Sequence, residues 1–463
     1  MLEVFQKRGV TSGLLAVGLL SAAAVYRYLG GEWNTASPLE RPLEILRDGV
    51  FYISPDNYVD TVKQLSRQGA VFLPAPQPDL QLVSSKSESK DYLGPDSCRE
   101  CHASYVDSAA MTAHFRTCRP AHSTSIHGLF GVGKNVLPTG NSEMSFRMSQ
   151  VEDRFYQSLV IKRHGENYVH SKPLELVTGS AKYGQSYLYW QNQCLYELPV
   201  SYFTDLGEWV NSPGYVDGVA NFARPISARC LECHTTWFEQ TGSPFNRFTS
   251  EGAIVGVTCE KCHGPGRQHV EHHHREPDDR QAKHIVNPAD LPRDYSIDLC
   301  SLCHSGGGES LRESFSFRPG DQLADFVRIP PNTESGPGGV HSANQHARMA
   351  LSRCFQESSE MQCTTCHNPH QQERGNVKLF VERCLKCHEA KDCGVVVRTG
   401  VVAEDRCIDC HMPRRSDSQM PMQKQDKTFR PMLRDHFIGK WDDVTADVLK
   451  ELAPDLNPQQ KHQ

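Results

Sequence analysis

The sequence predicts a mainly α-helical, loop-rich fold that carries one β-rich insert, and two observations lead to this prediction. The chain has 463 residues, 38% hydrophobic and 22% charged, and many of its 18 cysteines fall in short, closely spaced motifs. Such intervals are too short to enclose separate hydrophobic cores. One long stretch without these motifs alternates apolar and polar residues, as strands do. The composition excludes a polytopic membrane protein, and a net charge of -6 gives no reason to expect nucleic-acid binding.

Fourteen cysteines belong to seven identical C-x-x-C-H motifs, numbered 1 to 7 in chain order. The cysteines are Cys98, Cys101, Cys230, Cys233, Cys259, Cys262, Cys300, Cys303, Cys363, Cys366, Cys384, Cys387, Cys407 and Cys410, and the histidines are His102, His234, His263, His304, His367, His388 and His411. Zinc sites have no use for a histidine directly after each cysteine pair. In c-type attachment, both thiols form thioethers with haem and the histidine binds its iron. The sequence therefore predicts seven covalent c haems that form much of the core.

Four cysteines remain outside the motifs: Cys118, Cys194, Cys354 and Cys393. Two disulfides in an oxidising compartment and four buried free thiols are both compatible with this number.

The N-terminus has the pattern of a segment that directs a chain across a membrane. Lys7 and Arg8 precede an uncharged apolar run from 9 to 26, and Arg27 follows it. The length of this run lies between that of a signal-peptide core and that of a short spanning helix. We therefore expect either an anchor in the inner membrane, with the body on the periplasmic side, or a cleaved signal and a periplasmic protein.

Seven segments follow from the spacing of the motifs. They are residues 1–29, an anchor or signal; 30–90, an N-terminal segment and linker; 91–134, with motif 1; 135–225, the β-rich insert; 226–320, with motifs 2 to 4; 321–440, with motifs 5 to 7; and 441–463, a C-terminal tail. Within the insert, Met144, Phe146 and Met148 alternate with polar residues, and aromatic residues cluster between 182 and 203. A cover over the haems is the simplest role for the insert, and a binding surface is the alternative.

A second iron ligand decides whether a haem carries electrons or binds a substrate, because two histidines leave the iron no open position. Six further histidines lie near the motifs or near tight turns: His114, His269, His284, His346, His370 and His436. His127 and His341 are weaker candidates, and the run from 272 to 274 fits a solvated polar face. Six candidates thus face seven irons.

Several of these stretches resemble the cytochrome c-552/4 family of multihaem cytochromes. They are YLGPDSCRECHASY with TAHFR near motif 1, GVTCEKCHGPGRQHV at motif 3, and CIDCHMPRR with RDHF at motif 7. The resemblance implies an extracytoplasmic electron-transfer protein with closely packed, mostly bis-histidine haems, and it supports His114, His269 and His436 as ligands. Seven motifs exceed the four of a tetrahaem member, so the order of the haems does not carry over.

The leading hypothesis is a heptahaem cytochrome that passes electrons between redox partner proteins in a respiratory chain. Haem propionates would make the chain more acidic, which favours a basic docking patch on a partner. One alternative is an oxidoreductase with one open haem that acts on hydroxylamine, nitrite or a sulfur compound, for which no catalytic residue can be assigned. Another is a structural haem subunit of a respiratory complex.

Overall fold

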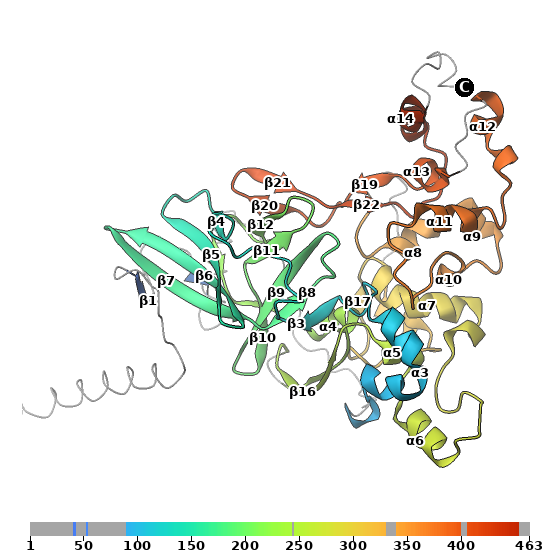
Figure 1. The fold of residues 1–463 in the computed structure, drawn as a ribbon, viewed down its shortest axis with the longest axis horizontal. Coiled ribbons are helices and arrows are strands. Elements are labelled where there is room, and N and C mark those ends of the chain that lie inside the picture. Colours follow the sequence, from blue (N-terminus) through green and yellow to red (C-terminus); the bar gives the residue numbers. More distant parts are fainter. Residues whose placement is uncertain are drawn as a thin grey trace, which may run out of the picture.

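The structure is a computed structural model that describes residues 40–42, 52–53, 89–242, 245–329, 339–399 and 405–452. The predicted membrane segment at residues 1–29 lies outside these residues. Within them, no helix combines the length and the apolar character that crossing a membrane requires. Figure 1 shows two regions side by side, one built from sheets and the other from short helices and loops.

The prediction of a mainly α-helical fold is wrong, because the protein has about 30% helix and 27% strand. Several helices that carry the motifs are short: α5 (Cys259–His263) has five residues and α10 (Cys363–Cys366) has four. One helical turn is enough to bring two cysteines three positions apart onto one face. Seven motifs therefore need little helix, whereas the insert contains longer strands, such as β6 (Arg154–Arg163) with ten residues.

A five-stranded sheet forms one half of the sheet region. Its spatial order is β1 (Glu40–Pro42), β7 (Glu166–Leu174), β6, β5 (Met144–Val151) and β4 (Val136–Pro138). Met144, Phe146 and Met148 of β5 are buried at alternate positions, as an antiparallel sheet with one packed face requires. The tight turn between β6 and β7 has positive φ at both His164 and Gly165, which matches the twist of a hairpin.

A seven-stranded sheet packs against it. Its members are β3 (Cys118–Pro120), β8 (Leu176–Thr178), β9 (Gly184–Gln191), β10 (Cys194–Glu197), β11 (Val200–Phe203), β12 (Glu208–Asn211) and β14 (Arg224–Pro225). The two sheets share one hydrophobic core that includes Phe146, Tyr187 and Trp209. Gln157 on β6 joins them through two buried bonds to Val200, donating to its carbonyl at 3.0 Å and accepting from its N–H at 2.9 Å.

The second region contains the motifs. Its α-helices are α3 (Pro95–Ala109), α4 (Ala228–His234), α5, α6 (Arg267–Arg275), α7 (Arg293–His304), α8 (Gln345–Met349), α9 (Arg353–Glu357), α10, α11 (Val377–Cys384), α12 (Gly394–Thr399), α13 (Cys407–His411) and α14 (Asp442–Leu452). Its 3-10 turns are η1 (Ser89–Asp91), η2 (Pro288–Asp290), η3 (Leu323–Asp325) and η5 (Ala390–Asp392).

Five two-stranded sheets complete the fold. They pair β13 (Ala220–Asn221) with β2 (Tyr52–Ile53), β15 (Thr235–Gln240) with β16 (Phe248–Val255), β17 (Glu309–Ser310) with β18 (Val327–Arg328), β19 (Arg414–Ser416) with β22 (Met432–Arg434), and β20 (Met422–Lys424) with β21 (Lys427–Phe429). The hairpin of β20 and β21 reaches back from the C-terminal part and lies against β12 (Figure 1). This hairpin thereby ties the C-terminal part of the motif region to the sheet region.

Candidate haem-binding site

Six of the seven motifs have both cysteines within one helix. Motifs 1 to 5 lie on α3, α4, α5, α7 and α10 respectively, and motif 7 lies on α13. Motif 6 begins at Cys384, where α11 ends. The i and i+3 positions of a helix share one face, so each pair of thiols can reach the same group. The sequence folds these turns with local caps, such as the Ser227 hydroxyl that accepts from the Cys230 N–H at 3.4 Å.

A single cavity of about 2440 Å³ connects most of the motifs. It is lined by the cysteines and histidines of motifs 1 to 5 and by Cys384 of motif 6. His114, His269, His346, His370 and His436, five of the six predicted second ligands, also line it. The residues of motifs 1 to 5 and five of the predicted second ligands therefore face one common space.

Four pairs of imidazoles face each other within this cavity. The ring centres are 6.4 Å apart for His102 and His269, 6.0 Å for His263 and His370, 6.2 Å for His304 and His114, and 6.2 Å for His367 and His436. Two imidazoles that bind one metal ion from opposite sides, each at about 2 Å, have ring centres roughly 6 Å apart. Every pair joins one motif histidine to one predicted second ligand, so these residues fit a bis-histidine iron.

Hydrogen bonds at Nδ1 orient the rings. His263 bonds the carbonyl of Val286 at 2.9 Å, His269 that of Lys283 at 2.8 Å, and His436 that of Arg434 at 3.1 Å. A proton held on Nδ1 leaves the Nε2 lone pair free for a metal. Desolvation by the surrounding protein lowers the pKa of His114 and of His436 to about 4, so both rings are neutral at neutral pH.

Buried carboxylates hold the motifs themselves in place. Glu260, inside motif 3, accepts from the N–H groups of Leu93 and Gly94 at 2.9 and 2.7 Å, at the start of the helix that carries motif 1. Glu373 accepts from the Asn368 N–H at 2.9 Å and pairs with Arg383, which also donates to the Cys366 carbonyl at 2.6 Å. The two carboxylates thus fix the backbone around motifs 1, 3 and 5.

Three motif histidines have other surroundings. His234 of motif 2 forms a 2.9 Å bond between Nδ1 and the Thr117 hydroxyl, and His411 of motif 7 bonds the Gly439 carbonyl at 2.8 Å. His388 of motif 6 is exposed. For the part of the chain that the structure describes, the recorded ring contacts pair none of these three with a second imidazole.

Two predicted second ligands also lie apart from the four pairs. His346 faces the cavity, but its Nδ1 bonds the Ser301 hydroxyl at 2.8 Å and its ring contacts Phe355. His284 is exposed, and its ring contacts that of His272 at 5.6 Å. His341, a weaker candidate, accepts the Ala343 N–H at its Nδ1.

Thiols of different motifs lie close to one another. The side chain of Cys98 lies beside that of Cys259, Cys233 beside Cys303, and Cys300 beside Cys363. Burial and then the nearby thiols of Cys407 and Cys366 raise the pKa of Cys384 to about 11. Motif 1 therefore adjoins motif 3, motif 4 adjoins motifs 2 and 5, and motif 6 lies between motifs 5 and 7.

The four cysteines outside the motifs are all free thiols in the structure. Cys118 and Cys194 are buried in the sheet region at 0% and 5% exposure. Burial raises the pKa of Cys118 to about 12, so this thiol is protonated and unreactive at neutral pH.

The sequence did not reveal several residues that orient these histidines. Thr117 touches His234 and Gln345 touches His304 across separations of 117 and 41 residues. Because Thr117 and Gln345 are far from these histidines in the sequence, no local sequence pattern marks the contacts. Glu260 and Glu232 lie inside motifs 3 and 2, but nothing in C-x-x-C-H asks for an acid between the cysteines.

Comparison with known proteins gives a short family match and distant relatives. Residues 218–264 match the family model "Cytochrome c554 and c-prime". The dissimilatory sulfite reductase MccA of Wolinella succinogenes is 20% identical over 394 residues, which cover 70% of this chain and 50% of that protein. The chain thus spans about half the length of this curated relative.

Two solved structures have a similar arrangement at 15% identity. The outer cell wall cytochrome OcwA has a TM-score of 0.47 and covers 80% of this chain and 85% of its own. The undecahaem S-layer cytochrome of Carboxydothermus ferrireducens has a TM-score of 0.36, with 88% and 59% covered.

The match to the c554 family model spans motifs 2 and 3. The same C-x-x-C-H pattern recurs five more times along the chain, and motifs 1, 3, 4 and 5 each present a paired imidazole. The chain is a multihaem c-type cytochrome that resembles the cytochrome c554 family.

Proposed function

We propose that this protein carries single electrons through an array of seven covalently attached haems outside the cytoplasm, between redox partner proteins. The observation that carries the proposal is the set of four imidazole pairs, with ring centres 6.0 to 6.4 Å apart. When bound, haem supplies an iron that exchanges one electron between its ferric and ferrous states, and two imidazoles leave it no place for a substrate. Carriage of electrons is the activity that this ligand set supports.

The contacts between motifs support a continuous path. The contact of Cys98 with Cys259 places motif 1 beside motif 3, and the contact of Cys300 with Cys363 places motif 4 beside motif 5. Cys262 also lies near Cys300, which links these two groups. The order of neighbours is then 1, 3, 4, 5, 6 and 7, with motif 2 as a branch at motif 4.

Replacement of one second ligand tests the proposal. We expect His114→Ala to convert one haem equivalent from low spin to high spin in the electron paramagnetic resonance spectrum of the oxidised protein. The reason is that His304 would remain as the single imidazole ligand of that iron. His122→Ala is the matched control, since His122 is an exposed histidine of the same segment. The intact mass should exceed that of the polypeptide by seven haems. A low-spin spectrum for His114→Ala, or a smaller mass excess, would contradict the proposal.

A second candidate function is reduction or oxidation of a small molecule at the haem of motif 2. His234 favours it, because it lines the cavity and no imidazole among the described residues pairs with it, whereas His388 and His411 do not line the cavity. The name of the relative MccA, a dissimilatory sulfite reductase, suggests a sulfur oxyanion as one substrate to try.

Spectroscopy of the unaltered protein separates the two functions. Under the carrier proposal, sulfite, nitrite and hydroxylamine produce no turnover. A high-spin signal in the unaltered protein that changes when sulfite is added, together with sulfite-dependent oxidation of a reduced dye, would instead establish the enzyme.

A further inference from the structure

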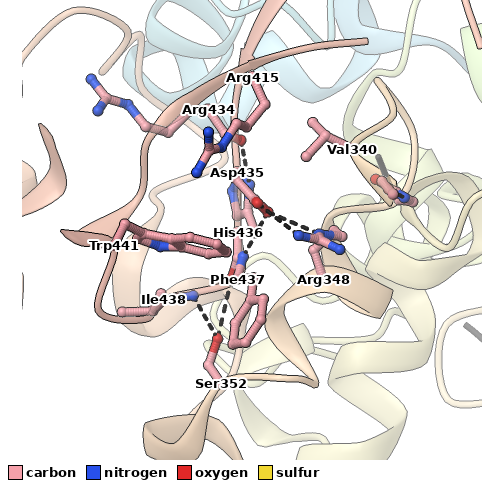
Figure 2. Close-up of polar contacts among 12 residues, drawn as sticks. Val340, Arg348, Ser352, Arg415, Arg434, Asp435, His436, Phe437, Ile438 and Trp441 are labelled. Atoms are coloured by element: carbon pink, nitrogen blue, oxygen red, sulfur yellow. Dashed lines mark hydrogen bonds and ion pairs between the residues drawn. The ribbon is translucent and has the colours of Figure 1, made fainter. Parts of the chain in front are cut away.

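A buried ion pair lies directly behind His436. Arg348 on α8 and Asp435, which follows β22, have side chains that are only 1% and 0% exposed. The Nε of Arg348 donates to Oδ1 of Asp435 at 2.9 Å, and an Nη donates to Oδ2 at 2.7 Å (Figure 2). A bidentate pair of this kind fixes the direction of the carboxylate as well as its position.

Asp435 also fixes the backbone around His436. Its Oδ1 accepts the N–H of Phe437 at 2.9 Å, and its own N–H donates to the carbonyl of Pro413 at 2.9 Å. Such a carboxylate, bonded two residues ahead, closes a tight turn. The ring of His436, which projects from this turn, donates from Nδ1 to the Arg434 carbonyl and faces His367.

A second contact secures the far side of the turn. The Ser352 hydroxyl accepts the Ile438 N–H at 2.8 Å and donates to the His436 carbonyl at 3.3 Å (Figure 2). Arg348 lies on α8, and Ser352 lies between α8 and α9. One short stretch of chain therefore contacts both sides of the turn.

The two faces of this haem site differ in how the ligand is held. His367 follows the cysteines of motif 5 and is held close by the thioethers that they form. His436 has no such tether, so noncovalent contacts must hold it. A buried ion pair adds little stability compared with apolar packing, because both charges must lose their water. Its contribution here is the fixed direction of the turn that carries His436.

We propose that Asp435, locked by Arg348, is a positioning residue that holds Nε2 of His436 in place to bind the iron of the motif 5 haem. This inference rests on the proposed function, in which His436 is an axial ligand. Asp435 acts through His436 and does not itself touch the iron.

The test compares Asp435→Asn with His436→Gly in the full haem-loaded protein, by electron paramagnetic resonance of the oxidised state. We expect His436→Gly to give one high-spin haem equivalent and Asp435→Asn to give a substantial fraction of the same signal. Added imidazole should return the His436→Gly protein to low spin. The double variant should show no more high-spin haem than His436→Gly alone, since both changes act on one ligand.

Asp217→Asn is the matched control, because Asp217 accepts the Gly140 N–H at 2.6 Å and the Asn211 side-chain amide at 2.8 Å in the sheet region and does not line the motif cavity. It should leave the spectrum unchanged. If the Asp435→Asn protein does not accumulate, Arg348→Lys takes its place in the test. This substitution retains the positive charge but loses the bidentate geometry, so we expect a partial high-spin signal.

Two results overturn the inference, and they are distinguishable. A fully low-spin Asp435→Asn protein beside a high-spin His436→Gly protein shows that Asp435 does not position the ligand, while the proposed function stands. A fully low-spin His436→Gly protein removes His436 as a ligand, and both the assignment and this inference fall.

Discussion

Hydrogen bonds at Nδ1 differ in kind among the motif histidines and their predicted partners. Those of His263, His269 and His411 go to backbone carbonyls, which no substitution removes. Those of His234 and His304 go to the side chains of Thr117 and Gln345. The two side-chain partners are therefore the places where the basicity of a proximal ligand can be changed by mutation.

We expect Thr117→Val to raise the midpoint potential of the motif 2 haem. Without the hydroxyl acceptor, the Nδ1 proton of His234 loses its partner, the imidazole becomes a weaker donor, and the ferric state is less stabilised. A tenfold change in the affinity of the ligand for ferric relative to ferrous iron corresponds to about 60 mV for one electron. We therefore expect a shift of this order. Spectropotentiometric titration measures it.

Thr139→Val serves as the control for this titration. Thr139 is a buried threonine of the sheet region whose hydroxyl bonds the Met144 carbonyl at 2.9 Å. Its loss should weaken the sheet region without moving any potential. An unchanged or lower potential for Thr117→Val would exclude the proposed effect on His234.

At the level of elements, the strands of the insert follow from the sequence better than the helices do. Met144, Phe146 and Met148 alternate along β5 and all are buried. The helical content was overestimated, because each haem motif needs only one turn of helix. Several strands outside the insert, such as β19 and β22, are only three residues long and leave no periodic pattern in the sequence.

A close approach of backbone to ring in the sheet region permits a test of its packing. A Cβ at Gly128 would lie 2.2 Å from the Trp209 ring, and this ring is 3% exposed in the core between the sheets. We expect Gly128→Ala to lower the free energy of unfolding of the sheet region by about 1 to 3 kcal/mol, because Trp209 must shift in a packed core. Denaturant unfolding followed by tryptophan fluorescence measures this loss.

Gly131→Ala is the matched control, because a Cβ there meets no atom within 4 Å. Neither substitution should change the haem absorption spectrum, since Trp209 does not line the motif cavity. Equal free energies of unfolding for the two variants would show that the Trp209 ring can move aside without a loss of stability.

The whole molecule combines two kinds of core. The sheet region packs Phe146, Tyr187, Trp209 and their neighbours around apolar side chains. The motif region instead surrounds a cavity of about 2440 Å³. Atoms around an unfilled space of this size lose their packing partners. The two regions should therefore depend on haem to different degrees.

We expect the protein made without haem attachment to be cleaved by protease in the motif region while the sheet region persists. Limited proteolysis followed by mass spectrometry should recover a fragment that includes residues 118–225, whereas the haem-loaded protein should remain largely intact over the same time. Degradation of both regions at one rate would show that the sheet region also needs the haems to fold.

The sequence by itself predicted covalent haem attachment, because C-x-x-C-H is a local pattern that needs only one helical turn. It also indicated most of the histidines that face the cavity. Tertiary structure alone decided the pairing. His114 follows His102 closely in sequence but faces His304, while His102 faces His269. The same holds for the Arg348 to Asp435 pair behind His436. These contacts join residues far apart in the chain, so they depend on how the whole chain packs and leave no mark in any local pattern.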